Sequence, residues 1–324
     1  MRALIVSIVF ALAQGLLSAP VGLSADLVIL KSSDTSSYQQ ALDSIRRHLP
    51  GQHSVKEYNL EGRLDRANDI GAVIRGTHPQ LVFAIGLKAT LVARAELPDT
   101  PILFCMVVHP EEYGLPAANM VGIVNKVAPA AQLQQIATLI PKAHSIGLLY
   151  DERKTGSFVA EAQRKARLLG MTLIAVPVAH QDAIVGTLRT LLPKIDLLWI
   201  VQDSTVVTED SLESLLESSL REKVPIFAFS TTLVRRGALG ALVIHPSDVG
   251  RQAARVAEAM LARRGLAAPA MLEPEVPQLA LNLNTAEFLG LATDQTTIRT
   301  AAILIGGPGD VAQQERTILN ELLQ

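Results

Sequence analysis

At 324 residues, 49% of them hydrophobic, the chain is long enough for two globular domains, each with its own core. Its 29 basic and 31 acidic residues nearly cancel, and no run of lysine or arginine could follow a phosphate backbone. These features argue against a nucleic-acid partner and against long-range steering of a charged ligand.

The N-terminal segment is typical of a secretory signal peptide. An apolar stretch from Ala3 to Leu17 follows Arg2, and it is shorter than the roughly 18 to 20 residues of a membrane-spanning helix. Small residues lead up to Ala25, so we expect residues 1–25 to be removed before Asp26; an uncleaved membrane anchor is the alternative. No later stretch is long and apolar enough to span a bilayer. The sequence therefore predicts a periplasmic protein.

Cysteine usage is consistent with a free exported protein. Cys105 is the single cysteine, so an internal disulfide is impossible, and no cysteine follows the apolar stretch to carry a lipid anchor. The residue lies within an apolar run and is interpreted as a small core side chain.

From Asp26 onward, short apolar runs alternate with segments of helical periodicity, which is the pattern of successive βαβ units. The runs are apolar throughout, as expected when helices cover both faces of a parallel sheet. In chain order they are DLVILK, LVFAIG, ILFCMVV, IGLLY, LIAVPV, LLWIV and PIFAF. The predicted fold class is α/β.

One helix can be predicted from its cap and its spacing. Thr208 is the expected N-cap, Glu209 and Asp210 favour the positive end of the helix dipole, and four leucines form the buried stripe, at positions 212, 215, 216 and 220. With the strands on either side, residues 197–229 make a complete βαβ unit.

The number of strands favours two Rossmann-like lobes with parallel sheets over one continuous sheet. The polar segment LIPKAHS, which contains Pro141, is the predicted boundary between a first lobe at 26–141 and a second at 142–245. Residues 247–265 form an amphipathic helix capped by Ser247 or Asp248. Residues 293–324 form a tail of unassigned position.

Ligands of open parallel sheets bind beyond the carboxyl ends of the strands. Six polar segments lie at predicted strand ends, and each residue in them is either a ligand contact or an ordinary helix cap. Because both lobes contain such segments, we expect the binding site to be a cleft between the lobes. The six polar segments are 32–37 (with Ser33), 86–90 (with Lys88), His109, 150–157, 202–205 and 230–232.

Catalytic motifs are lacking. The sequence has no Gly-x-Ser-x-Gly elbow, Walker loop or Gly-x-Gly-x-x-Gly turn after a strand, and GGPGD at 306–310 is interpreted as a surface turn. The seven histidines show no paired ligand spacing, so we expect neither a metal nor another cofactor. The chain is predicted to bind rather than to catalyse.

Several segments resemble the substrate-binding proteins of ABC transporters that include tryptophan and tyrosine uptake proteins. They are LVFAIG, TPILFCMVVHP, QLQQIATLIPKAHSIGLLYDE, LLWIVQDSTVV, VPIFAFSTTLVRRGAL, DVGRQAA and LALNLNTAEFLGL, which span about 79–291. The resemblance implies a type I periplasmic-binding architecture with hinge crossovers. In that arrangement the helix at 247–265 returns to the first lobe and about 278–292 joins the second.

The resemblance also implies which residues line the pocket. In that family, three loops line the pocket. In this chain the loop after LLY carries Asp151, the loop after LLWIV carries Asp203 and Thr205, and the loop after IFAF carries Ser230 and Thr231. Asp203 is the foremost of these candidates.

This chain departs from the family pattern at four places. Asp151 stands where Asn is usual, Ser230 where Asp is usual, His109 in a Thr-Asp-Pro position, and Leu87 and Lys88 where small residues are usual. Compared with the family pattern, this chain lacks one acidic side chain and has two additional basic ones, Lys88 and His109. We therefore hypothesise that its solute is more acidic than an amino acid. The alternative is that Lys88 points to solvent and has no part in the site.

The function predicted from the sequence is capture of a small solute, either an amino acid or a small carboxylate or aromatic compound, by a monomeric protein that delivers it to an ABC permease in the inner membrane. A periplasmic sensor that signals to a membrane receptor or kinase is the alternative, and an exported enzyme is a third reading.

Overall fold

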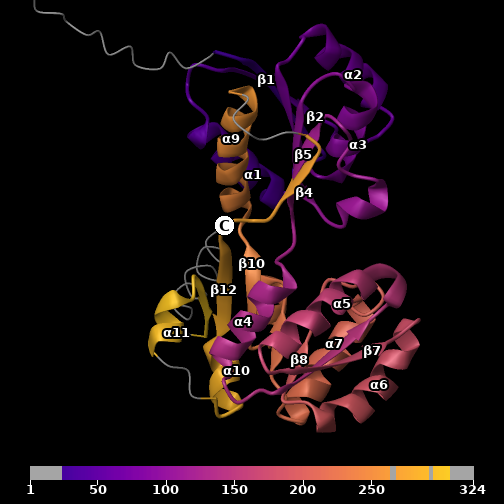
Figure 1. Cartoon of the computed structure of the whole chain (residues 1–324), viewed down its shortest axis with the longest axis vertical. Helices are drawn as coiled ribbons and strands as arrows, with labels where there is room; N and C mark the ends of the chain where they lie inside the picture. The colour runs from indigo at the N-terminus through magenta and orange to yellow at the C-terminus, as the bar shows by residue number, and fades with distance from the viewer. Residues whose placement is uncertain (1–23, 263–267, 292–294, 307–324) are drawn as a thin grey trace, which may run out of the picture.

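Two β-sheets, one above the other in Figure 1, form the centres of two lobes. The computed structural model describes residues 24–262, 268–291 and 295–306. Residues 1–23 of the predicted signal peptide, and most of the GGPGD segment and the tail after it, lie outside the described residues. The two separate sheets confirm the α/β class with two lobes.

The first sheet has six strands in the order β11-β5-β4-β3-β1-β2, and every neighbouring pair is parallel. Its strands are β1 (Asp26–Lys31), β2 (Ser54–Asn59), β3 (Leu81–Ile85), β4 (Ile102–Val107), β5 (Met120–Val124) and β11 (Ala270–Leu272). Its helices are α1 (Ser36–His48), α2 (Ala67–Gly76), α3 (Leu87–Glu96) and α9 (Pro246–Leu261), with a short 3-10 turn at Pro110–Tyr113.

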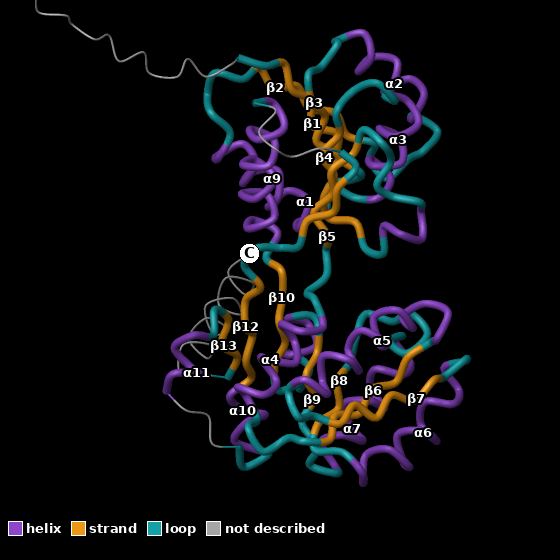
Figure 2. Tube along the Cα trace, viewed as in Figure 1, coloured by secondary structure: helices purple, strands orange, loops and turns teal. Residues whose placement is uncertain are grey.

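Helices cover both faces of the first sheet, which explains its uniformly apolar strands. Alternate residues of β1 point to opposite faces, so Leu27 and Ile29 pack with α1 and α9, whereas Val28 and Leu30 pack with α2 and α3. In Figures 1 and 2, α1 and α9 lie together on one side of the sheet, away from α2 and α3.

The second sheet has seven strands in the order β13-β12-β10-β9-β8-β6-β7, with β10 and β12 antiparallel and the other pairs parallel. Its strands are β6 (Ser145–Tyr150), β7 (Thr172–Pro177), β8 (Leu197–Trp199), β9 (Ile226–Ala228), β10 (Gly240–Ile244), β12 (Pro277–Asn282) and β13 (Ile303–Ile305). The helices α4 (Pro129–Leu139), α5 (Glu152–Leu168) and α10 (Leu283–Phe288) pack on one face. The other face carries α6 (Ile184–Leu191), α7 (Glu209–Arg221) and α8 (Thr231–Arg235). Short 3-10 turns at Gln181–Ala183 and Leu192–Lys194 flank α6, and α11 (Gln295–Thr300) precedes β13.

The chain crosses between the lobes three times within the described residues. The crossovers are 125–128 between β5 and α4, His245 between β10 and α9, and 273–276 between β11 and β12. All three lie at the same level between the sheets in Figure 2. The arrangement confirms the predicted two-lobed architecture with hinge crossovers.

The lobe boundary predicted near Pro141 is wrong by one helix. Leu133 and Ile136 of α4 pack in the same cluster as Ile146 and Leu148 of β6, so α4 belongs to the second lobe. The crossover is the short segment before Pro129, because proline at 141 ends a helix and does not separate lobes.

Helix caps were predicted with mixed success. Thr208 caps α7, and Ser211 returns the hydrogen bond in a capping box. Neither Ser247 nor Asp248 caps α9, however. Its N-cap is His245, whose ring accepts from the Ser247 amide at 3.4 Å, since Pro246 occupies the first helical position.

A close helix pair joins α9, where the chain returns to the first lobe, to α1 near the start of that lobe. The helices α1 and α9 meet at Gly250, where a Cβ atom would overlap the carbonyl oxygen of Ala41. Beside it, the Ser44 hydroxyl donates to the Ser247 carbonyl at 2.6 Å. The absence of a side chain at 250 is therefore a packing requirement.

Candidate functional site

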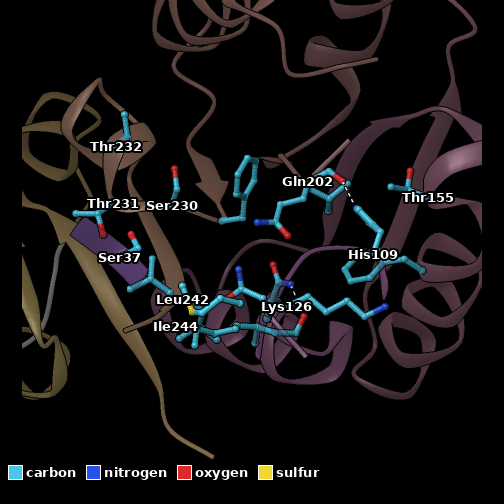
Figure 3. Close-up of a pocket in the computed structure, with 18 of the residues that line it drawn as sticks. Ser37, His109, Lys126, Thr155, Gln202, Ser230, Thr231, Thr232, Leu242 and Ile244 are labelled. Carbon is cyan, nitrogen blue, oxygen red and sulfur yellow. Dashed lines mark hydrogen bonds between the residues drawn. The ribbon is translucent and has the colours of Figure 1, made fainter. Parts of the chain in front are cut away.

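A cavity with about 1170 Å³ of empty space, part of it open to solvent, lies between the two lobes. Figure 3 shows polar side chains from both lobes around it, with Ser37, Ser230 and Thr231 toward one end and His109 and Thr155 toward the other. Its lining comes from the first lobe (Ser37, Met106, His109, Glu111, Pro246), from the first crossover (Asn125, Lys126, Val127) and from the second lobe (Gln132, Lys154, Thr155, Ser157, Phe158, Val201, Gln202, Phe229, Ser230, Thr231, Thr232, Leu242, Val243, Ile244).

The end of β4 is distorted where it meets this cavity. The register with β5 shifts between Phe104 and Val107, and Met106 in the bulge has φ of 60°. His109 follows with φ of 49°. Two side-chain-bearing residues in the left-handed region within four positions are costly, and bulges are a common way to re-aim side chains at binding sites. Here the distortion directs Met106 and His109 into the cavity.

His109 also makes a direct contact between the lobes. Its Nε2 atom lies 3.3 Å from the backbone oxygen of Gln202, at the end of β8, as the dashed line in Figure 3 shows. A second cavity, with about 720 Å³ of empty space on the same measure, lies next to the first and is lined by Val108, His109, Glu112, Lys154, Gln202, Asp203, Ser204, Val207 and Phe229. Four residues line both cavities: His109, Lys154, Gln202 and Phe229.

Aromatic packing links the larger cavity to the core of the second lobe. Phe158 lines the cavity and packs against Trp199 with ring centroids 5.6 Å apart. The Trp199 indole donates to Gln132 Oε1 at 3.0 Å, and the Gln132 amide donates to the Val127 carbonyl at 2.8 Å. The buried indole is thereby linked to a crossover residue, Val127, and to two side chains that line the cavity, Phe158 and Gln132.

Three of the residues predicted from the sequence line the larger cavity, namely His109, Ser230 and Thr231. Ser230 also caps α8, where its hydroxyl accepts from the Leu233 amide at 3.3 Å. Ser230 therefore both caps a helix and lines the cavity, so a role as a helix cap does not exclude a position at the candidate site.

Asp203, the foremost candidate, is buried and reaches only the smaller cavity. Its Oδ2 accepts from the Asp151 amide at 2.7 Å and the Thr155 hydroxyl at 2.6 Å. Its Oδ1 accepts from the amides of Thr205 at 2.9 Å and Val206 at 3.2 Å. Both carboxylate oxygens are thus taken by the protein, and Asp203 supports the cavity indirectly through Thr155.

Asp151 and Thr205 belong to the same network and line neither cavity. Asp151 caps α5 and accepts from the Thr205 hydroxyl at 2.9 Å. The Arg153 side chain, the Arg153 amide and this hydroxyl hold the pKa of Asp151 at about 2, against the opposing effect of burial. The network joins β6 to β8, where the strand order of the second sheet reverses.

Ser33 and Lys88 lie outside both cavities. Lys88 is on the exposed first turn of α3, and its ammonium donates to the carbonyl of Gly62. In the same region the Ser32 hydroxyl, at the end of β1, accepts from the Ala89 amide in the first turn of α3 at 2.9 Å. The charge of Lys88 therefore reaches neither cavity.

The lysines that do reach the larger cavity are Lys126 and Lys154. Lys126 lies 3.5 Å from Glu111 Oε1, and His109 Nδ1 lies 3.6 Å from the same oxygen. Burial raises the pKa of Glu111, but its backbone hydrogen bond and the charges of Lys126 and His109 outweigh this effect and lower it. Lys154 was within a predicted strand-end segment, whereas Lys126 follows β5, a strand that the seven apolar runs omitted.

The described residues contain no cluster of three His, Cys, Asp or Glu side chains arranged to hold a metal ion. Within the same ranges, no helix combines the length and the apolar character needed to cross a bilayer.

Two lobes joined by three crossovers, with a polar cavity between them, are the architecture of a solute-binding protein. The model of the family "ABC transporter substrate binding protein" matches residues 38–304. The chain belongs to this family, whose members are binding proteins and not enzymes.

Named relatives agree with this assignment. The chain is similar to a tyrosine-binding protein of Clostridioides difficile (strain R20291), with 22% identity over 72% of this chain and 69% of that protein. It is also similar to a ligand-free, open structure of a substrate binding protein with adhesive properties from Clostridium difficile (TM-score 0.73, 19% identity, 87% and 99% covered). A third is an ABC domain in complex with L-Trp from Streptococcus pneumonia (TM-score 0.59, 20% identity, 87% and 100% covered). At these identities the solved structures support the fold alone.

Proposed function

We propose that this protein captures a small solute in the cavity between its lobes and delivers it to an ABC permease. The observation that carries the proposal is the origin of the cavity lining, which comes from both lobes and from the first crossover. A solute in contact with both lobes stabilises the closed arrangement over the open one, because some of its contacts exist only when the lobes meet. Closure then distinguishes loaded from empty protein for a membrane partner.

The proposal includes export, action as a monomer in the periplasm, and removal of the leader at Ala25. The support is the N-terminal sequence, with one positive charge and a short apolar stretch before small residues. In the structure β1 begins at Asp26, the residue that would become the new N-terminus.

Solute capture can be tested by calorimetry over a panel of amino acids, small carboxylates and simple aromatic compounds. Trp199 provides a second readout, because it contacts two cavity residues, Phe158 and Gln132. A solute present at 100 times its dissociation constant should add about 2.7 kcal/mol to the free energy of unfolding.

A variant that fills the cavity makes the test specific. Thr231→Trp should abolish binding of any hit, whereas Thr190→Trp, at an exposed position of α6, should not alter it. Unchanged binding by Thr231→Trp would exclude the cavity as the solute site. Import is tested by deleting the gene and measuring uptake of the bound solute. Normal uptake, together with loss of a transcriptional response to the solute, would favour sensing.

A further inference from the structure

The charges around the larger cavity do not balance. Its lining contains two lysines and one carboxylate, Glu111. Glu111 forms an ion pair with Lys126. Burial raises the pKa of Glu273, on the third crossover, and the charge of Lys126 only partly opposes this effect. Lys154 is different: its ammonium donates to the Ser204 hydroxyl at 2.7 Å and forms no ion pair with any residue in the described part of the chain.

An α-amino acid needs an anionic partner for its ammonium group as well as donors for its carboxylate. The nearby carboxylates of Asp151 and Asp203 cannot serve, because all four of their oxygens already accept hydrogen bonds from the protein. Glu111 is the remaining acid of the larger cavity, and it is shared between Lys126 and His109. The larger cavity therefore offers cationic groups and no free anion.

Donor groups gather where the two cavities meet. Lys154, His109 and Gln202 all line both cavities, and the Gln202 side-chain amide makes no hydrogen bond with the described residues. Lys154 is also in the first turn of the 17-residue helix α5, where the helix dipole favours a negative charge. This junction combines an ammonium group, an amide and an imidazole within one region of the cleft.

Apolar side chains line the larger cavity beside this junction. Phe158 and Phe229 supply aromatic surface, and Met106, Leu242 and Ile244 supply aliphatic surface. The hydroxyl groups of Ser37, Ser230 and Thr231 lie toward the end away from His109 and carry no charge. A ligand with one anionic group at the junction and an apolar body next to it fits this lining.

We propose that the larger cavity binds an organic acid that has an apolar body and lacks an ammonium group, with its carboxylate at the junction formed by Lys154, Gln202 and His109. This inference rests on the proposed function and narrows its solute class. Its competitor is an amino acid whose ammonium lies in the smaller cavity, which Glu112 lines.

Three compounds with the same ring and side-chain carbons separate these cases. L-Phenylalanine carries both charged groups, 3-phenylpropanoate lacks the ammonium, and 2-phenylethylamine lacks the carboxylate. Calorimetry on the full mature chain should give the tightest binding for 3-phenylpropanoate and none for the amine. Raising the ionic strength should weaken binding of the acid, because the Lys154 ammonium is exposed and its attraction is screened.

The variant Lys154→Met should weaken binding of 3-phenylpropanoate by about 10- to 100-fold, as expected for a lost hydrogen bond to a charged group. Lys165→Met, in the last turn of the same helix, is the matched control and should leave binding unchanged. Lys154 is exposed, so the variant should fold normally, which its thermal melting curve checks.

Two results would overturn the inference without affecting solute capture. The first is tighter binding of L-phenylalanine than of the acid, with loss of that preference in Glu112→Gln. The second is a solute that co-purifies with the exported protein and carries an ammonium group, while none of the three compounds binds. If no solute co-purifies and nothing in the wider panel binds, the proposed function fails as well.

Discussion

Replacement of Asp203 by alanine distinguishes a structural carboxylate from a ligand contact. The substitution removes the acceptor of four hydrogen bonds, from the amides of Asp151, Thr205 and Val206 and from the Thr155 hydroxyl. If Asp203 served the ligand, the free protein would keep its stability and lose only binding. The structure predicts instead that the free protein itself is destabilised.

The size of the effect follows from the donors left without partners. The Thr155 hydroxyl also lies 3.4 Å from the Asp151 carbonyl and can turn to it, and the Thr205 amide is partly exposed to water. The amides of Asp151 and Val206 are buried and have no substitute. At about 1 to 3 kcal/mol for each unsatisfied buried group, the free energy of unfolding should fall by about 2 to 6 kcal/mol.

Equilibrium urea unfolding, followed by Trp199 fluorescence, measures this loss. Trp199 is the single tryptophan of the chain and is buried on the same strand that leads to Asp203, so its signal reports on the second lobe. The control is Asp182→Ala, at an exposed position, which should change stability by no more than about 0.5 kcal/mol. A loss below about 1 kcal/mol for Asp203→Ala, accompanied by loss of solute binding, would refute the reasoning.

Three further predictions test other parts of the structure. In thermal melts, Gly250→Ala should lower the free energy of unfolding by about 1 to 3 kcal/mol, because the added methyl group pushes α1 away from α9. The control Gly186→Ala, with open space around it, should be neutral or stabilising by up to about 1 kcal/mol. The pKa of Asp151 is lowered from 3.8 to about 2, so its charged form stabilises the fold above pH 4 and this effect is lost as the pH falls toward 2. The difference in melting temperature between the wild type and Asp151→Asn should therefore disappear over that interval, and a constant difference would contradict the assignment. Burial raises the pKa of Cys105 to about 12, so a disulfide reagent at pH 8 should label it only as urea unfolds the first lobe, and rapid labelling of native protein would contradict its burial.

The fold could be predicted from the sequence because both sheets are covered on both faces. Strands such as β3 are then apolar at every position, and such runs stand out. One apolar strand, β5, was nevertheless omitted from the predicted runs although it is fully buried, and exposed strands gave no such signal. The edge strand β2, SVKEYN, is partly exposed along its whole length and contains no apolar run. The lobe boundary was misplaced because a crossover of four residues has no composition of its own.

The candidate site was harder to predict, for a physical reason. A polar residue after a strand either faces the cleft or satisfies the backbone of its own loop, and sequence position does not separate these outcomes. Asp203 and Asp151 turned inward to bind each other's loops, whereas Lys154, in one of the same segments, faces the cavity. Lys126, a crossover residue, also lines the cavity, although it lies in none of the polar segments predicted at strand ends.

The return of β11 to the first sheet has a consequence for how the chain is made. β5 is apolar and fully buried in the finished protein, yet its outer neighbour is not synthesised until residue 270. While the second lobe is being synthesised, β5 is therefore an unpaired, apolar edge strand that is prone to pair with other chains. A chaperone that holds residues 120–124 during this interval would be expected to raise the yield of folded protein more than one that acts on any surface of the completed molecule.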